Sequence, residues 1–256
     1  MFHQDFSMNL ISISYREFYS TLKSIKLLIF PVFVAILFNS LSLKISAQSD
    51  STGFTLDGGV DLMSRYIWRG QEYGHAPSIQ PALSASWKGF TLGTWGAYKF
   101  NGAGEQETDL YFSKEIGPLS LAVWDYFTFS DTSDFDYFNY SESGTSHIFE
   151  AQALISGGEK IPFNLLAGYF FYGADSSKSL YFELQYLPKF LQADLQFFAG
   201  VQAKGDFYAS QAAFVNLGCS WTKSIPVSNH FSLPLSISFI INPDRKSTYL
   251  VAGINL

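Results

Sequence analysis

The sequence predicts an all-β fold, an antiparallel, transmembrane, up-and-down β-barrel of about 12 strands. Three observations point to it. From Phe54 to Leu256, apolar and polar residues alternate in short segments, and a period of two marks strands with two different faces. The connections between segments are short and long in turn, as in barrels with tight turns at one rim and loops at the other. The chain also begins with a stretch that resembles an export signal.

Residues 1–47 are expected to be a removable signal peptide. Arg16, Lys23 and Lys26 make the start positive, residues 27–38 form an uninterrupted apolar run, and small residues then offer a signal peptidase site. A membrane anchor is the alternative. A spanning helix needs about 20 mostly apolar residues, however, and the stretch between the flanking lysines is shorter and interrupted by polar residues.

Residues 48–256 are then expected to form the barrel. The whole chain has a net charge of −6, and an acidic balance argues against nucleic acid as a partner. Cys219 is the only cysteine, so neither an intramolecular disulfide nor a cysteine-rich metal site is possible. No barrel segment reaches the run of about 18 apolar residues that a helical membrane span requires.

The first half of the barrel alternates plainly between an apolar and a polar parity. Six strands are expected there, at residues 54–69, 78–87, 90–100, 107–116, 119–130 and 147–156. Lys88–Gly89 and Gly117–Pro118 supply tight turns between neighbours. Asp125 falls on the apolar side of its strand, so we expect a β-bulge near Trp124.

The second half repeats this design. Six more strands are expected, at residues 163–172, 179–187, 190–202, 213–222, 231–241 and 248–256. Residues 163–172 are aromatic on both parities and give no orientation. In the last strand Leu250 and Leu256 belong to the row expected to face lipid, with Tyr249 and Asn255 towards the lumen.

Aromatic residues gather at both expected rims, as they do where a barrel meets lipid headgroups. One rim would carry Trp68, Tyr98, Phe129 and Phe171, and the other Trp87, Phe90, Tyr186 and Trp221. A soluble β-sandwich or lipocalin-like barrel is the alternative, since its strands alternate too. Periodicity alone does not say which face is buried.

The polar parity is the candidate functional surface. The residues expected to line the lumen are Asp57, Asp61, Arg65, Arg69, Trp95, Lys99, Glu107, Asp109, Tyr111, Trp124, Tyr126, Glu150, Gln152, Glu183, Gln185, Asp194 and Gln196. Acidic side chains outnumber basic ones on this face, which favours a modest preference for cations. Twelve strands enclose more space than eight, whose interior side chains can fill, so a narrow channel is favoured over a barrel plugged by paired charges.

An enzyme that modifies lipid is the main competing function. It needs a serine, a histidine and an orienting residue grouped on the outer surface. His147 is the only histidine expected near the outer leaflet, and its neighbour Ser146 should point away from it. No catalytic residue, cofactor or metal site is therefore expected. The acidic residues Asp131, Asp134 and Asp136 lack the glycine and terminal glutamate of an EF-hand and are expected to be solvated.

Four short stretches resemble those of a known family. Ser64–Gly70 followed by Pro77–Pro81, and then Gly93–Gly96 and Glu107–Tyr111, are similar to the opening elements of the TorF-like porins, a bacterial family also labelled Gcw_chp. The resemblance is concentrated in residues 61–128. It implies an outer-membrane location and a porin role, and it carries no catalytic residue or cofactor.

These observations together predict a porin-like outer-membrane channel in a Gram-negative bacterium for passive diffusion of small hydrophilic solutes. Its expected partners are outer-membrane lipid, those solutes, and the barrel-assembly machinery, which would bind the C-terminal strand. A non-conducting structural or adhesive barrel is the alternative.

Overall fold

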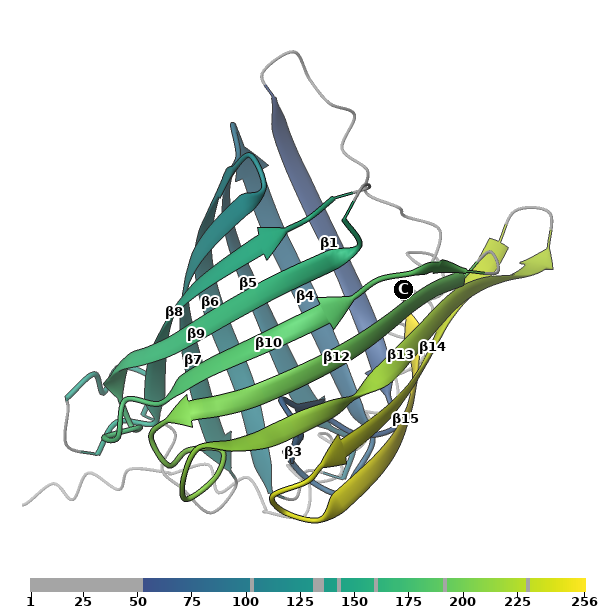
Figure 1. Cartoon of the computed structure of the whole chain (residues 1–256). Helices are drawn as coiled ribbons and strands as arrows, with labels where there is room; N and C mark the ends of the chain where they lie inside the picture. The colour runs from purple at the N-terminus through teal and green to yellow at the C-terminus, as the bar shows by residue number, and fades with distance from the viewer. Residues whose placement is uncertain are drawn as a thin grey trace, which may run out of the picture. The chain divides into compact units, whose positions relative to one another are not determined.

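The computed structural model describes residues 53–101, 104–130, 136–141, 144–158, 161–190, 193–228 and 231–256. All regular structure in these residues is β, within the compact unit Ile45–Leu256 (Figure 1). None of the described residues belongs to a helix long and apolar enough to cross a membrane. The expected signal peptide and two of the loop aspartates, Asp131 and Asp134, lie outside the described residues.

Twelve long strands form one closed antiparallel sheet. They are β1 (Phe54–Met63), β4 (Ser78–Trp87), β5 (Phe90–Lys99), β6 (Glu105–Ile116), β7 (Leu119–Ser130), β8 (His147–Ser156), β9 (Phe163–Gly173), β10 (Leu180–Tyr186), β12 (Ala193–Lys204), β13 (Ala213–Ser228), β14 (Phe231–Asn242) and β15 (Ser247–Asn255). Each pairs with its neighbours in sequence, and β1 pairs with β15 through Asp61↔Asn255 to close the ring. The predicted up-and-down barrel of 12 strands is confirmed.

The connections follow the predicted alternation. Tight turns at residues 88–89 and 117–118 lie at one end of the barrel, here called the turn rim. The longer segments 64–77 and 205–212 lie at the other end, the loop rim. Three strands of two residues each, β2 (Ile67–Trp68), β3 (Gln71–Glu72) and β11 (Lys189–Phe190), complete the structure.

The outer face of the barrel is apolar and exposed. The exposed side chains include Leu56, Leu83, Leu92, Leu110, Phe112, Leu121, Val123, Ile155, Leu165, Leu184, Phe197, Phe214, Ile237, Phe239 and Leu250. Leu250 and Leu92 are 69% and 62% exposed, whereas Val251 and Gly93, their neighbours on the other parity, are buried. This distribution is the reverse of a soluble barrel, which keeps its apolar face inside.

Lysines and aromatic rings meet on the outer face near the turn rim. The Lys88 ammonium lies 4.5 Å from the centre of the Trp87 ring, and that of Lys114 lies 3.8 Å from the centre of the Phe90 ring. Lys114 also donates a hydrogen bond to the Lys88 carbonyl at 2.7 Å. Amphipathic rings beside lysine side chains are typical of the border between lipid and water.

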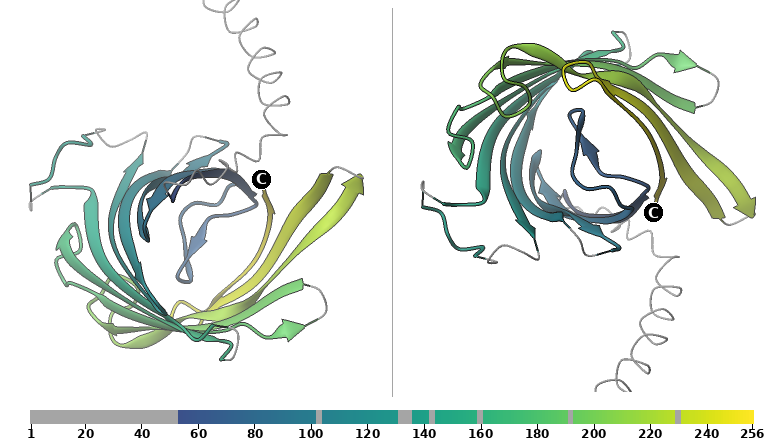
Figure 2. Two further views of the ribbon diagram at one scale, coloured as in Figure 1. Left: turned by 90° about the horizontal axis from the view of Figure 1, so that it is seen from above. Right: turned by 90° about the horizontal axis from the view of Figure 1, so that it is seen from below.

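The first predicted strand is too long. β1 ends at Met63, and the residues predicted to continue it, 64–69, turn into the barrel interior (Figure 2). Arg65 and Arg69 therefore do not belong to the wall, and Trp68 does not belong to a rim. The alternation of residues 64–69 is genuine, but it reflects a small hairpin inside the barrel rather than the end of a wall strand.

The predicted bulge at Trp124 is also wrong. β7 pairs with β6 and β8 without a register shift, so Asp125 does face outwards, where it meets His147. Register shifts occur instead at other places in the sheet, one of them between β8 and β9 beside Phe149 and Glu150.

β9, whose orientation the sequence did not give, has one clear face. Leu165 and Tyr169 are exposed outside, while Gly168 and Phe170 are buried on the other parity.

Candidate functional site

A hairpin crosses the interior of the barrel. In β2 and β3, Ile67 pairs with Glu72 and Trp68 with Gln71, and the Tyr73 amide donates to the Tyr66 carbonyl at 3.0 Å. We call residues 66–73 the lumen hairpin. Both end views in Figure 2 show it, in blue, inside the ring of strands. Main chain, and not only side chains, therefore occupies the lumen near the loop rim.

The tip of the lumen hairpin is a two-residue turn, Arg69–Gly70. Both residues have positive φ, 48° and 75°, as the central residues of a type I′ turn do. Glycine adopts this conformation freely, whereas arginine does so only under constraint. The constraint comes from the contacts that the Arg69 side chain makes with the opposite wall.

Arg69 is bound to Glu150 by two hydrogen bonds. Nη1 donates to Oε1 at 2.6 Å and Nη2 to Oε2 at 3.1 Å, and both side chains are buried. Nη1 also donates to the Tyr208 hydroxyl at 2.6 Å, and the guanidinium lies 4.4 Å from the centre of the Tyr181 ring. We call Arg69 and Glu150 the inner pair. Removing one partner from such a buried, two-pronged pair costs about 3–5 kcal/mol.

The wall is shaped to receive this tip. A Cβ at Gly168 of β9 would collide with the Glu150 carboxylate and crowd the Arg69 guanidinium. A Cβ at Gly70 would collide with the main-chain oxygen of Val215 on β13. Gly70 also accepts a hydrogen bond at 3.0 Å from the side chain of Asn242, which is fully buried on β14. The turn is thus in contact with the far side of the barrel.

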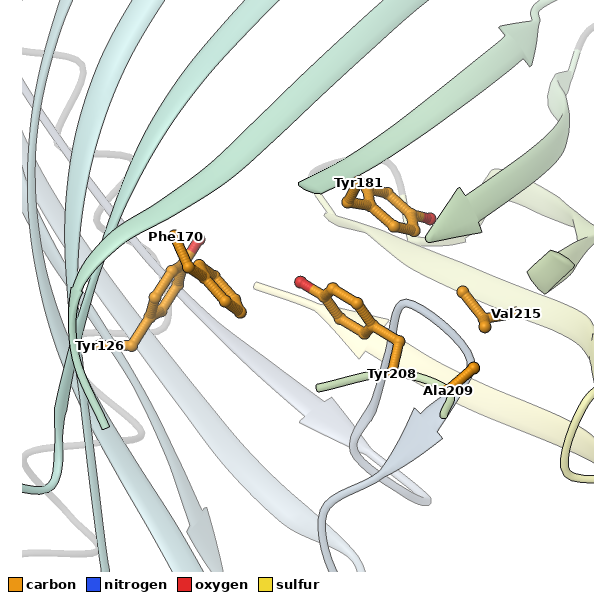
Figure 3. Close-up of a cluster of buried hydrophobic side chains, with 6 residues drawn as sticks. All are labelled: Tyr126, Phe170, Tyr181, Tyr208, Ala209 and Val215. Atoms are coloured by element: carbon orange, nitrogen blue, oxygen red, sulfur yellow. The ribbon is translucent and has the colours of Figure 1, made fainter. Parts of the chain in front are cut away.

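Aromatic rings fill the space on one flank of the hairpin. The Trp68 ring lies 5.3 Å from Tyr126 and 6.4 Å from Phe170, measured between ring centres. Tyr126, Phe170, Tyr181 and Tyr208 form the buried cluster in Figure 3. The Tyr126 hydroxyl donates to Glu150 at 2.7 Å, which joins the cluster to the inner pair.

A second inward segment, residues 205–212, holds Tyr208 in place. Gln202 is fully buried on β12, and its side-chain oxygen accepts hydrogen bonds from the amides of Tyr208 at 2.7 Å and Ala209 at 3.2 Å. Its side-chain nitrogen donates to the carbonyl of Gly205 at 2.8 Å. One glutamine therefore organises the segment that presents Tyr208 to Arg69.

The other flank of the hairpin meets a group of predicted lumen residues. Tyr66 donates to Glu107 at 3.1 Å, and its ring centre lies 5.2 Å from that of Trp95. Asp109 is the next inward residue of β6 after Glu107 and is also buried. Lys99 is buried on β5, with its Nζ against Gly74 and Gly104.

The structure brings most of the predicted lumen residues into contact with one another. Arg69, Tyr126, Glu150 and Gln152 share one network, and Trp95, Glu107 and Asp109 gather at the other flank. Tyr111 and Trp124 stack with ring centres 4.4 Å apart. Gln185 donates to Glu183 at 2.8 Å.

The remaining predicted residues lie apart from these groups. Arg65 is half-exposed at the base of the hairpin, where it pairs with Glu72 at 2.8 Å. Asp61 accepts a hydrogen bond from Asn255 at 2.9 Å. Gln196 is partly buried, and Asp57 and Asp194 are exposed near the turn rim.

The half of the lumen towards the turn rim has a different character. Hydroxyl and amide groups pair across its wall, such as Ser220 with Ser238 at 2.7 Å and Ser86 with Thr91 at 2.8 Å. These side chains are only partly buried. The buried charged residues of the inner wall gather instead around the hairpin, so the two halves of the lumen differ in chemistry.

A second buried pair lies on the outer face. His147 Nδ1 is 2.6 Å from Asp125 Oδ1, Nε2 is 2.6 Å from the carbonyl of Tyr137, and the ring stacks on Tyr140 at 4.2 Å. We call His147 and Asp125 the outer pair. His147 is 0% exposed and both ring nitrogens face acceptors, so the pair anchors segment 136–141 on the wall. An orienting carboxylate is present, but neither ring nitrogen is left to activate a nucleophile.

Sequence reasoning included Glu150 but missed the other residues around Arg69. Tyr208, Gly70 and Gly168 complete the site, and none stands out by alternation. The Arg69–Gly70 dipeptide is the one local signal of a turn, since glycine favours positive φ.

The fold and the site together define a closed β-barrel whose interior is crossed by a pinned hairpin. The model of a bacterial protein family of unknown function (Gcw_chp) matches residues 47–248, and this chain belongs to that family. The predicted Gcw_chp membership is confirmed, and the match extends well beyond residues 61–128. The family description gives no function, so the link to TorF-like porins stays a prediction. No curated protein and no solved structure matches the chain.

Proposed function

We propose that this protein is an outer-membrane barrel that lets small hydrophilic solutes diffuse through a lumen narrowed by the lumen hairpin. In this proposal residues 1–47 direct export and the C-terminal strand engages the barrel-assembly machinery. The exposed apolar outer face supports a lipid environment, because so large an apolar surface is unfavourable in water. The lysines and rings at the turn rim support a headgroup level there.

One observation carries the proposed channel. A barrel of 12 strands is wider than side chains alone can fill, and here the closing material is a hairpin whose tip is bound by specific hydrogen bonds. Its other end continues directly into β1 and β4, so it is tethered but not part of the sheet. Such a segment can narrow a pathway without sealing it permanently, whereas a barrel filled from its wall cannot open.

Liposome swelling tests the proposal directly. We expect vesicles that contain the purified barrel to swell in an isosmotic solution of a small neutral solute such as glycerol or arabinose. An oligosaccharide should give slower swelling because the hairpin narrows the path. Heat-modifiable migration on a denaturing gel is the control for correct folding. A folded barrel that admits neither solute would contradict the channel and favour the structural or adhesive barrel.

The proposed function involves no catalysis. Support comes from the outer pair, the one arrangement in the described residues that resembles part of a hydrolytic triad. His147 is wholly buried, and its second ring nitrogen contacts the main-chain carbonyl of Tyr137 rather than a hydroxyl. Lipid hydrolysis by the purified barrel that is lost in His147→Gln would overturn this part of the proposal.

A further inference from the structure

We infer that segment 136–141 is an interfacial anchor, which inserts Phe138 into the lipid headgroup layer at the loop rim. The inference rests on the proposed outer-membrane location and adds a contact with the bilayer that the wall strands do not make. Its partner is the lipid surface rather than a protein or a solute. It also gives a role to the outer pair, which holds this segment on the outer side of the wall.

The outer pair lies at the height where the second border of the membrane is expected. The transmembrane band of a barrel is about 25 Å tall, which takes roughly ten residues of a tilted strand. Counted along β7 from Leu119, beside the tight turn, this length ends near Phe129. His147 is the sheet partner of the nearby Phe127. The segment that His147 holds therefore lies close to that border.

The segment covers a polar pair that faces outwards. Asp125 shares the outward parity of Val123, which is exposed on the outer face. Ionisable side chains in contact with lipid are unfavourable. Here the main-chain carbonyl of Tyr137 lies 2.6 Å from His147 Nε2, and the Tyr140 ring stacks on the imidazole. As a result His147 is fully buried and Asp125 is only 9% exposed.

The covering segment presents an aromatic ring to its surroundings. Phe138 is 85% exposed, more than any other large apolar side chain in the described residues. Its ring centre lies 5.4 Å from that of Tyr137. Ring contacts continue from Tyr140 to Phe149 at 6.1 Å and from Phe149 to Phe171 at 6.0 Å, so the aromatic surface reaches β9. A ring so exposed is unfavourable in water, whereas the border between lipid and water accommodates it.

Continuity and charge both favour lipid as the partner. The aromatic surface continues the exposed apolar face of the wall, so a lipid phase that covers the wall reaches the segment too. Residues 119–156 contain no lysine or arginine, whereas Lys88 and Lys114 stand beside aromatic rings near the turn rim. The attraction at the loop rim is therefore apolar, and it should depend little on lipid charge or on salt.

Fluorescence quenching in liposomes tests the inference. The variant Phe138→Cys, in a Cys219→Ser background, is labelled with nitrobenzoxadiazole and reconstituted in phosphatidylcholine vesicles. Lipid that is spin-labelled near the headgroup should quench this label about twofold or more strongly than the same label in Asp244→Cys. Asp244 is the matched control, because it lies in the exposed, charged turn between β14 and β15 at the same rim. Iodide in the water should show the opposite preference.

The native cysteine separates this inference from the proposed function. Cys219 is the sheet partner of Phe239, which is exposed on the outer face, and directly paired residues share a face. A label on Cys219 should therefore be quenched by lipid that is spin-labelled along its acyl chain. The absence of quenching at Cys219 would refute the proposed membrane barrel. Quenching at Cys219 without quenching at position 138 would leave the barrel standing and overturn the anchor.

The role of the outer pair is tested by adding His147→Gln to the labelled Phe138→Cys variant. Release of the segment should weaken quenching by lipid and strengthen quenching by iodide. If that protein does not fold, as judged by heat-modifiable migration, Asp125→Asn takes its place. Unchanged quenching would overturn the role of the pair. A label at position 138 that neither lipid nor iodide reaches would mean that protein covers the segment, for example a second copy of the chain, and would overturn the lipid anchor.

Discussion

Strand β8 contributes one residue to each of two buried pairs, one on each of its faces and three positions apart. On the inside, Glu150 binds Arg69, a residue 81 positions away in sequence. On the outside, His147 binds Asp125 on the adjacent strand β7, only 22 positions away. Both pairs hold a connecting segment against the wall near the loop rim. The inner pair holds main chain across the lumen, whereas the outer pair holds segment 136–141 flat against the barrel.

The two pairs therefore have different expected roles. The outer pair anchors a loop outside the barrel, whereas the inner pair holds the segment that narrows the lumen. A buried charge pair is weak evidence of stability by itself, because desolvation offsets much of the attraction. What each pair fixes is the position of a loop. Loss of either pair should destabilise the barrel, but only loss of the inner pair should change what passes through it.

Arg69→Ala should have the largest effect. It leaves Glu150 buried without its cation and should lower the free energy of unfolding by about 3–5 kcal/mol. Because the tip of the hairpin is no longer held against the wall, single-channel recordings should show a larger unit conductance. Arg65→Ala is the matched control, because Arg65 forms a half-exposed pair with Glu72 and its loss should cost less than about 1 kcal/mol. Equal effects of the two variants would mean that the inner pair is not what holds the hairpin.

Gly70→Ala should open the lumen partly. The new methyl group meets the Val215 main chain, so the tip must withdraw from β13. Gly117→Ala isolates the steric effect, because Gly117 also has positive φ but has open space around its Cβ position. Strain from positive φ alone should cost about 1 kcal/mol in both variants. Only Gly70→Ala should raise the rate at which liposomes swell in arabinose. An unchanged rate would mean that the tip of the hairpin is not the constriction.

Neutralising Glu107 and Asp109, beside the hairpin on β6, should change ion selectivity without moving the hairpin. The combined variant Glu107→Gln, Asp109→Asn removes the negative charge of this buried carboxyl pair from the lumen, so the permeability ratio of potassium to chloride should fall by about two- to threefold. Reversal potentials in a salt gradient measure this ratio. Glu115→Gln is the control near the turn rim. A ratio that stays constant would show that the ions do not pass this flank.

His147→Gln should have the smallest effect on transport. It removes the outer pair and the ring stacked on Tyr140, so segment 136–141 should become accessible to protease, at a cost of about 1–3 kcal/mol. Unit conductance should not change. Glu150→Gln, three positions along the same strand, is the comparison and should change conductance. A change in conductance in His147→Gln would remove the distinction between the two faces of β8.

Much of the wall could be predicted from alternation, because each wall strand separates an apolar face from a polar one. Asp125 shows a limit of this reasoning: its place on the apolar parity led to the prediction of a bulge, whereas it faces outwards and pairs with His147. Glu107 and Asp109 share a parity, so their common face followed from the sequence. The pairing of Arg69 with Glu150 did not follow, because alternation contains no information on which residue lies across a lumen.

The hairpin was missed for a specific physical reason. Residues 64–69 keep the period of β1, and a strand that continues in the wall looks the same locally as one that enters a hairpin. Whether residues 64–69 continue in the wall or enter the hairpin depends on groups that are distant in sequence. These are the Asn242 side chain, the Val215 main chain and the space left by Gly168. These contacts exist only once the barrel has closed.

The central claim is that the lumen hairpin narrows an otherwise wider pathway. The most direct measurement is the unit conductance in planar bilayers of the wild type and of a variant in which residues 66–73 are replaced by a Gly-Ser linker of equal length. The control replaces residues 136–141 in the same way. We predict a conductance several times that of the wild type for the hairpin replacement and an unchanged conductance for the control. Equal conductance in all three proteins, or none in any of them, would contradict the account.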